Sequence, residues 1–292
     1  MKEFLRLDNK VIIELKIKPL SPLCIKLSSE EEENDKSSTY SSVLSTEGGK
    51  TEARKTEANK TGDLECDTRR GEIYIPGSSL KGLFRDRFVT MYKSKSDFIK
   101  NLFGYIDNNK KAKKSRIFLQ DAFLFEEEKR KVFYDNNKFQ DTINDAMKEF
   151  IKTRSITPID SFTAKAVAPL RFEYTTEDFR GEILINNAEI EEIQGIYFII
   201  RDSINGEIRI GNSKTRGFGK IKFEVSNFKY SVFRGKEEKF EKFERFFEID
   251  DKSSTKVGDN YFEKVMKLKD EFKEINLDNP NDFIKALFSE VK

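Results

Sequence analysis

The chain has 292 residues, and its 27 Phe and 9 Tyr supply enough apolar material for a packed interior, which excludes a wholly disordered chain although 36% of its residues are charged. The formal net charge of only +2 provides little overall attraction to nucleic acid, so any such function must depend on local clusters of cations. Abundant Lys and Glu with no His, no Trp and two Cys follow the composition trend of thermophile proteins.

Signals for metal binding and membrane targeting are weak. Cys24 and Cys66 lack CxxC spacing and no histidine can join them, so we expect idle thiols, or a disulfide in a hyperthermophile, rather than a structural zinc site. No stretch approaches the roughly 20 apolar residues of a membrane helix, and the N-terminus has no apolar signal-peptide region. We therefore expect a soluble cytoplasmic protein with no membrane contact.

The N-terminal third begins with a strand and continues into a polar segment. Residues 11–18 alternate between apolar and polar and start β-branched, which predicts the first core strand. Residues 28–62 are dominated by Ser, Thr, Glu, Lys, Asn and Gly and cannot bury enough surface to offset their ordering entropy. This composition predicts a disordered loop, which is either a tolerated insertion or a flap that orders when a ligand arrives.

Residues 75–82 read IPGSSLKG and lead into a helix. Leu80, Leu83, Phe84, Phe88 and Met91 recur at three- and four-residue spacing, which predicts a helix from residue 79 to about residue 92, with its positive end at the glycine segment. A second helix is predicted at 190–200, and further strands at 116–125, 170–174, 181–185, 207–210 and 221–225. This order predicts an α+β fold with a ferredoxin-like or RRM-like sheet and helices on one face.

The residue pattern changes beyond residue 230, where aromatic residues recur at helical spacing. We expect three amphipathic helices, built around Phe240, Phe243, Phe246 and Phe247, then Phe262, Val265, Met266 and Phe272, then Phe283, Ile284, Leu287, Phe288 and Val291. The predicted organisation is a core at 1–230, with the loop at 28–62 and insertions at about 93–170, and a helical C-terminal extension at 231–292. The extension would pack on the core or on a neighbouring subunit.

A second glycine-rich segment, GNSKTRGFG at 211–219, lies between two predicted strands. Glycine allows close approach to the backbone, while lysine and arginine supply charge and donors at the same place. The two glycine segments together therefore predict a cradle for a phosphate backbone, although a basic turn is also compatible with a solvated loop. Leu83 and Phe84 stand where a Walker-type phosphate loop needs Lys and Ser or Thr, which argues against an NTPase.

Four motifs follow one another in the order of a known family. They are IPGSSLKGLFRDRF at 75–88, LFG at 102–104, SRIFLQDA at 115–122 and RIGNSKTRGFGKI at 209–221. Together they resemble the RAMP superfamily of CRISPR-associated proteins and, more narrowly, a backbone subunit of a type III, Csm-like effector complex. ITPIDSFTAKAVAPLRFEY at 156–174 is similar to the thumb with which those subunits touch guide RNA. The resemblance extends over roughly residues 11–228.

The resemblance implies a ferredoxin-like core, a thumb insertion, and two glycine loops that face guide RNA. Contacts with the sugar-phosphate chain would come chiefly from Lys81, Lys214 and Arg216. Phe162 and Phe218 are candidates for stacking or wedging against bases, with the protein core as the alternative place for either. The full set of candidate RNA-binding residues is Ser78, Ser79, Lys81, Arg85, Arg116, Phe162, Lys214, Arg216, Phe218 and Lys220.

The resemblance also raises the question of catalysis. Some type III backbone subunits carry an Asp between the first strand and the first helix that is needed for metal-dependent cleavage of target RNA. Asp63 and Asp67 fall in that loop, but Asp63 lies closer to Pro76 than the resemblance predicts, so either residue or neither is expected to act. Cleavage would need a divalent ion, Mg²⁺ or Mn²⁺, and a subunit without cleavage would need no cofactor. The absence of histidine argues against an imidazole general base.

These features predict a guide RNA-binding subunit in antiviral defence, with guide RNA, complementary target RNA and other RAMP subunits as partners. Two alternatives to an endoribonuclease stay open. In the first, the chain binds RNA and the loop carboxylates have no chemistry. In the second, it is a non-catalytic assembly or capping subunit, whose aromatic C-terminal helices bind another protein and whose glycine loops are tight turns.

Overall fold

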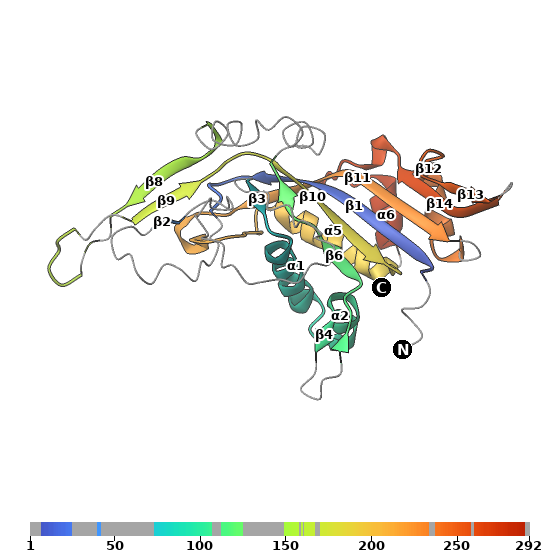
Figure 1. The fold of residues 1–292 in the computed structure, drawn as a ribbon, viewed down its shortest axis with the longest axis horizontal. Helices are drawn as coiled ribbons and strands as arrows, with labels where there is room; N and C mark the ends of the chain where they lie inside the picture. Colours follow the sequence, from blue (N-terminus) through green and yellow to red (C-terminus); the bar gives the residue numbers. More distant parts are fainter. Residues whose placement is uncertain are drawn as a thin grey trace, which may run out of the picture.

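The computed structural model describes residues 7–24, 40–41, 73–106, 112–124, 149–157, 159, 161–166, 170–233, 237–257 and 260–289. The centre of the fold is an antiparallel sheet with four core strands, β1 (Asn9–Pro19), β6 (Ile117–Leu119), β10 (Phe179–Asn186) and β11 (Ile221–Phe233). Helices α1 (Gly77–Met91) and α5 (Ile190–Ile204) cover one face of it (Figure 1). The spatial order β11-β1-β10-β6 and the chain order β1-α1-β6-β10-α5-β11 define the predicted ferredoxin-like core.

The alternation of side chains along β1 orients this sheet. The odd-numbered residues from Val11 to Ile17 are buried, whereas the residues between them are partly exposed. Ile13 lies opposite Ile183 of β10 and Phe228 of β11, so three central strands direct apolar side chains to the same face. This shared face holds the main core, against which the two helices pack.

Short elements surround the β6 side of the sheet. They are β3 (Tyr74–Ile75), α2 (Ser96–Phe103), β4 (Tyr105–Ile106), β5 (Ala112–Lys113) and β7 (Ala122–Phe123). Of these, β7 and β3 extend the sheet, whereas β4 and β5 form a separate two-stranded sheet. The single strand predicted at 116–125 is therefore wrong, because the chain leaves the sheet between β6 and β7. At that break the Asp121 carboxylate accepts a hydrogen bond from the backbone N–H of Gly77, with a distance of 2.7 Å. The break thus fixes the beginning of α1.

The predicted thumb projects from the core as an arm (Figure 1). We use the name thumb for the described residues between 149 and 174. Its stem is the antiparallel pair β8 (Lys152–Ile156) and β9 (Leu170–Tyr174), and β2 (Tyr40–Ser41) pairs in parallel with β9. The rest of the loop predicted at 28–62 lies outside the described residues. The stem continues through Thr175 into β10, so the arm is joined directly to the central sheet.

The C-terminal extension is not wholly helical as predicted. It contains η2 (Glu237–Phe246), β12 (Phe247–Ile249), β13 (Thr255–Val257), β14 (Asn260–Leu268), η3 (Asp270–Phe272) and α6 (Asp282–Phe288). The helix expected through Phe262, Val265 and Met266 is instead β14, which pairs with β11 so that Met266 lies opposite Tyr230. Pairing with the free edge of β11 overrides the helical spacing of the apolar residues.

The aromatic residues of the extension pack on this chain's own sheet. Phe283 of α6 has ring contacts with Tyr197 of α5, Phe228 of β11 and Phe247 of β12, at centroid distances of 5.9, 6.0 and 5.7 Å. The Gln194 side chain donates a 2.7 Å hydrogen bond to the Leu287 carbonyl and ties α5 to α6. Phe240, Phe243, Phe246, Phe247 and Phe283 of the extension are thus buried within this chain, whereas Phe262 of β14 is 52% exposed. None of the helices described is both long and apolar enough to cross a membrane.

Candidate nucleic-acid interface

Helix α1 begins at the first glycine segment, and its two glycines have different neighbours. A Cβ added at Gly77 would lie 2.2 Å from the Leu119 carbonyl oxygen, so this glycine is required by packing within the protein. Its amide is already bonded to Asp121. The prediction that the amides at this helix end are open to a ligand is therefore wrong for Gly77, because a carboxylate already occupies the positive end of the helix.

Gly82, one turn further along, is exposed on the surface of α1. Among the described residues, no heavy atom apart from the local helix backbone lies within 4 Å of a Cβ added there. Ser78, Gly82 and Arg85 are all exposed and follow i, i+4, i+7 spacing, so they share one face of the helix. This face combines a hydroxyl, a bare stretch of backbone and a guanidinium, and it is opposite the face that buries Leu80 and Phe84.

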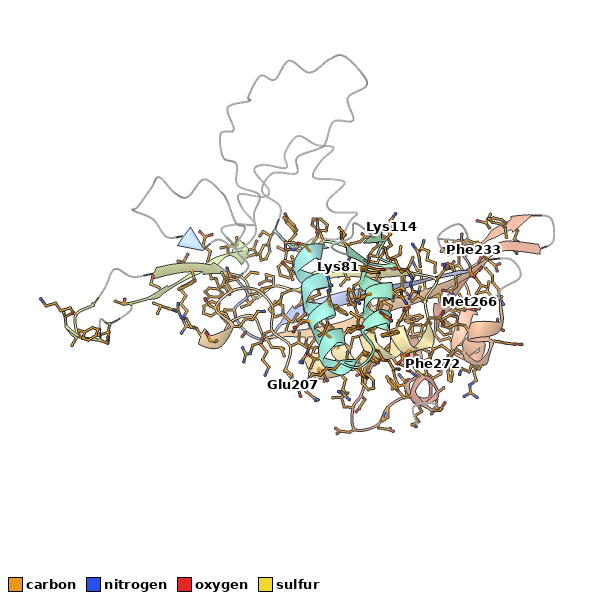
Figure 2. The ribbon with its side chains drawn as sticks, turned by 90° about the horizontal axis from the view of Figure 1, so that it is seen from below. Lys81, Lys114, Glu207, Phe233, Met266 and Phe272 are labelled. Carbon is orange, nitrogen blue, oxygen red and sulfur yellow. The ribbon has the colours of Figure 1, made fainter. Side chains whose placement is uncertain are left out.

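Lys81 lies beside this face and contacts the segment that precedes β6. Its Nζ donates a 3.0 Å hydrogen bond to Ser115 Oγ. Burial, with a smaller contribution from the nearby Arg85 charge, lowers the pKa of Lys81 from its usual value. Lys114, adjacent in sequence to Ser115, is exposed and adds a cation to this end of the helix (Figure 2).

The second glycine loop, residues 211–219, owes its shape to a series of left-handed residues. Gly211, Ser213, Gly217 and Gly219 have φ of 84°, 55°, 88° and 78°. A Cβ at Gly219 would lie 2.0 Å from the Ile210 carbonyl oxygen, which makes that glycine necessary for the close return of the chain. The loop folds into the 3-10 turn η1 (Lys214–Arg216), whose two cations are exposed.

A cavity of ≈ 490 Å³ brings the two glycine segments together. Ser79 and Gly82 line it from α1, and Gly211, Asn212 and Lys214 line it from the second glycine loop. The remaining lining residues are Leu83, Asp86, Arg87, Glu207, Ile208, Arg209 and Ile210. Stretches separated by about 130 residues in sequence thus form one concave surface.

The end of the cavity away from Lys81 carries charges of both signs. Figure 2 shows Glu207 beside α1 toward the C-terminal end of that helix. Arg87 Nη2 lies 3.5 Å from an Asp202 carboxylate oxygen and 3.7 Å from one of Glu207, so α1 is linked electrostatically to the last turn of α5 and to the segment after it. Asp86 adds another carboxylate. Cations that face away from these carboxylates lie in the Lys214 and Arg216 turn and at the Lys81 and Arg85 end of α1.

Sequence reasoning missed two groups of lining residues, namely Leu83, Asp86 and Arg87 of α1 and residues 207–210. A sequence signal existed for Asp86, because it follows Arg85 at a position outside the apolar pattern of the predicted helix. No such signal existed for Glu207 and Arg209. The strand predicted at 207–210 is wrong, since the structure has only an isolated bridge between Arg209 and Lys220.

The structure assigns Arg116 a structural role in place of the predicted RNA contact. Its guanidinium forms an ion pair with the buried Glu192 of α5 and donates to the carbonyl oxygens of Asn101 and Asn187. Burial raises the pKa of Glu192, and the Arg116 charge opposes that shift. The pair joins the strand β6 to the first turn of α5.

Two further predicted contacts lie in positions unsuited to RNA. The expectation that Phe218 stacks on bases is wrong, because its side chain is 0% exposed and packs beside Phe172 of the thumb stem. The Lys220 side chain lies against the backbone at the end of α5, where a Cβ added at Gly206 would be 2.1 Å from Lys220 Cε. There its charge complements the negative end of the helix.

Phe162 differs from Phe218, since it is 97% exposed. Ile159, on the same part of the thumb, is 70% exposed. Two large apolar side chains of the thumb are thus largely exposed to solvent. The prediction that Phe162 contacts bases is compatible with this position.

The open face of the sheet does not have the chemistry of a base-stacking platform, because charged side chains at its centre form ion pairs with one another. Charged side chains alternate there with the buried residues of β1. Ion pairs on this face join Lys16 to Asp178, Lys18 to Glu224 and Lys229 to Glu14, at 2.8, 2.7 and 3.2 Å. Such a surface differs from the aromatic sheet face with which RRM domains stack bases.

Asp63 and Asp67 lie outside the described residues, so the structure does not place them. Within the ranges that are described, no group of three or more Cys, Asp or Glu side chains could hold a metal ion. Two expectations therefore stay predictions: a divalent ion, Mg²⁺ or Mn²⁺, if the chain cleaves RNA, and no cofactor if it does not.

The ferredoxin-like core, the two facing glycine segments and the projecting thumb define the class of protein. Residues 16–224 match the model of the RAMP superfamily, and the chain belongs to that superfamily. The resemblance predicted from the motifs is thereby confirmed.

Individual relatives are more specific. The chain is 30% identical over 164 residues, which are 51% of this chain and 68% of the relative, to the CRISPR system Cms endoribonuclease Csm3 of Streptococcus thermophilus. Among solved structures it is similar to a chain of type III-B Cmr-beta bound to cognate target RNA, with a TM-score of 0.46, 13% identity, and coverage of 73% of this chain and 96% of that chain. A chain of Cmr-beta in the apo state gives a TM-score of 0.45 at 13% identity, with coverage of 74% and 97%.

Proposed function

We propose that this chain is a guide RNA-binding backbone subunit of a type III CRISPR effector complex in antiviral defence. The observation that carries the proposal is the single concave surface formed by α1 and the second glycine loop, which Lys214 lines, with Arg216 exposed in the same η1 turn. Membership of the RAMP superfamily and similarity to Csm3 support the same function. Other RAMP subunits and a complementary target RNA are its proposed partners.

The RNA backbone would lie along the bare face of α1 and reach the η1 turn. Gly82 leaves room for a sugar-phosphate chain close to the helix, while Ser78, Arg85, Lys214 and Arg216 supply donors and positive charge. These groups can hold RNA without reading its bases. Such contacts suit a subunit that must bind guides of any sequence.

The thumb would contribute an apolar contact away from the cradle. Phe162 can stack on a base or wedge between two bases, since every base offers an aromatic face. This stacking contact, like the contacts with the sugar-phosphate chain, would not depend on which base is present.

A salt series tests the cradle. We expect the double variant Lys214→Ala/Arg216→Ala to bind single-stranded RNA more weakly in filter binding, and the slope of log affinity against log salt to fall by about 1.4, or about 0.7 for each lost phosphate contact. Lys252→Ala, which removes an exposed lysine of the C-terminal extension, is the matched control and should change neither quantity. An unchanged slope in the double variant would refute the cradle.

We further propose target RNA cleavage that depends on Asp63 or Asp67 and on Mg²⁺ or Mn²⁺. The name of the relative Csm3, an endoribonuclease, supports this part of the proposal. The test is incubation of the assembled complex with complementary RNA and Mg²⁺, using Asp63→Ala and Asp67→Ala. Loss of cleavage in one variant with RNA binding retained supports the enzyme, and cleavage that survives both substitutions excludes these residues.

A further inference from the structure

A small second core, separate from the main one, lies where the thumb meets the second glycine loop. Cys24, Phe172 and Phe218 are buried in it, and Ile156 and Tyr174 pack around them. These five residues come from three segments, namely the turn after β1, the thumb stem β8–β9 and the second glycine loop. Each segment supplies at least one of the three buried side chains.

Phe218 is the contact through which the glycine loop enters this core. Its ring centroid lies 5.9 Å from that of Phe172 and 6.3 Å from that of Tyr174, which it meets edge to face. The Arg154 guanidinium of β8 lies over the same ring at 5.7 Å. Both strands of the thumb stem therefore contact one side chain of the loop.

Backbone hydrogen bonds hold the three segments in the same arrangement. The Asn212 N–H donates to the Cys24 carbonyl at 2.7 Å, and the Gly219 N–H donates to the Pro22 carbonyl at 2.8 Å, so both ends of the loop are fixed to the turn after β1. Leu23 and Thr175 exchange two hydrogen bonds, of 2.9 and 3.1 Å, which join that turn to the base of the thumb. The turn thus bridges the other two segments.

The two cations proposed to bind RNA belong to the same loop as Phe218 but lie outside the small core. Lys214 and Arg216 are exposed, whereas Phe218, two residues further on, is wholly buried. Only one residue, the left-handed Gly217, separates the η1 turn from Phe218, so a loss of motion at the turn can pass to Phe218. The loop therefore has an RNA-facing side and a thumb-facing side.

We infer that Phe218 is a positioning residue that couples the thumb to the RNA cradle. RNA bound at Lys214 and Arg216 restrains the loop, and the packed Phe218 ring passes this restraint to β8 and β9. The thumb then keeps a fixed distance from the cradle, so that Phe162 meets the bound strand at a set number of nucleotides from the phosphates held by the loop. This inference rests on the proposed function.

Amide hydrogen exchange of the full chain, with and without a uridine tetranucleotide, tests the coupling. In the wild type, the tetranucleotide should slow exchange both at residues 211–219 and in the thumb stem, residues 170–174. In Phe218→Leu the slowing of the stem should be lost while that of the loop remains. Arg154→Ala keeps the buried ring in place and should reduce the slowing of the stem, which provides a second variant if Phe218→Leu does not fold.

Phe162→Ala is the control for direct contact between the tetranucleotide and the thumb, and slowing of the stem should persist in it. Loss of that slowing in Phe162→Ala would overturn the inference, because the RNA would then act on the thumb directly. Slowing confined to the loop in the wild type would overturn the inference and leave the proposed function standing. No slowing at the loop would overturn the proposed function and the inference together.

Discussion

Replacing Gly82 by alanine should change the stability of the protein and its affinity for RNA in opposite directions. Gly82 is in the interior of α1, has no positive φ, and is next to empty space in the described structure. Alanine at such a position should stabilise the helix by about 0.5–1 kcal/mol, because glycine loses more backbone entropy on folding. The expected rise in Tm is about 2 °C.

The same substitution should weaken RNA binding. The new methyl group would stand between Ser78 and Arg85 on the face where the sugar-phosphate chain is proposed to lie. A loss of about 1 kcal/mol, or about fivefold in Kd, is expected if the chain must move away from the helix to accommodate it. Chemical denaturation and filter binding on the same preparations measure both effects.

Gly195→Ala is the matched control, since Gly195 is also helical but buried in α5. Its Cβ would lie 2.5 Å from Phe88 Cζ, so we expect destabilisation of about 1–3 kcal/mol from overpacking. Stabilisation by Gly82→Ala with unchanged RNA affinity would refute the close approach of RNA to α1. Destabilisation by Gly82→Ala would refute the assignment of empty space at this position.

Three further substitutions or reactions follow from the geometry. Gly219→Ala should destabilise the protein by about 1–3 kcal/mol, because its φ is 78° and its Cβ would lie 2.0 Å from the Ile210 carbonyl oxygen, and urea unfolding would show a lower midpoint. Phe162→Ala should leave that midpoint unchanged within about 0.5 kcal/mol, since the side chain is 97% exposed, but lower RNA affinity in filter binding. Burial raises the pKa of the Cys24 thiol to about 11, so in a Cys66→Ser background Cys24 should stay unreactive to iodoacetamide at pH 8 until the protein unfolds, and rapid reaction of the folded protein would contradict the buried second core.

The core elements could be predicted because their signals are local. Alternation along β1 and three- and four-residue spacing along α1 each reflect one buried face of one element. The strand β14 could not be predicted in this way, since the spacing of Phe262, Val265 and Met266 is helical and its strand conformation comes from pairing with β11. The information that decides it lies in the partner strand.

The candidate site likewise combines features that local sequence predicts with features that distant partners decide. The two glycine segments were recognisable from composition, and their meeting in one cavity follows from the ferredoxin-like topology. Whether Arg116 and Phe218 face the protein or RNA depends on distant partners. Glu192 is 76 residues from Arg116, and Phe172, the partner of Phe218, belongs to the thumb stem. A cation and an aromatic residue beside glycine have the same appearance in sequence whether they face RNA or the protein.

The central claim is that α1 and the second glycine loop hold the same stretch of RNA. The most direct measurement is photocrosslinking of the chain to RNA that carries a single 4-thiouridine, moved one nucleotide at a time, with the crosslinked peptides identified by mass spectrometry. The account predicts that peptides with residues 78–85 and with residues 211–219 are labelled from the same or adjacent nucleotides. Labelling that falls on the open face of the sheet, or that reaches only one of the two peptides at every position, would contradict it.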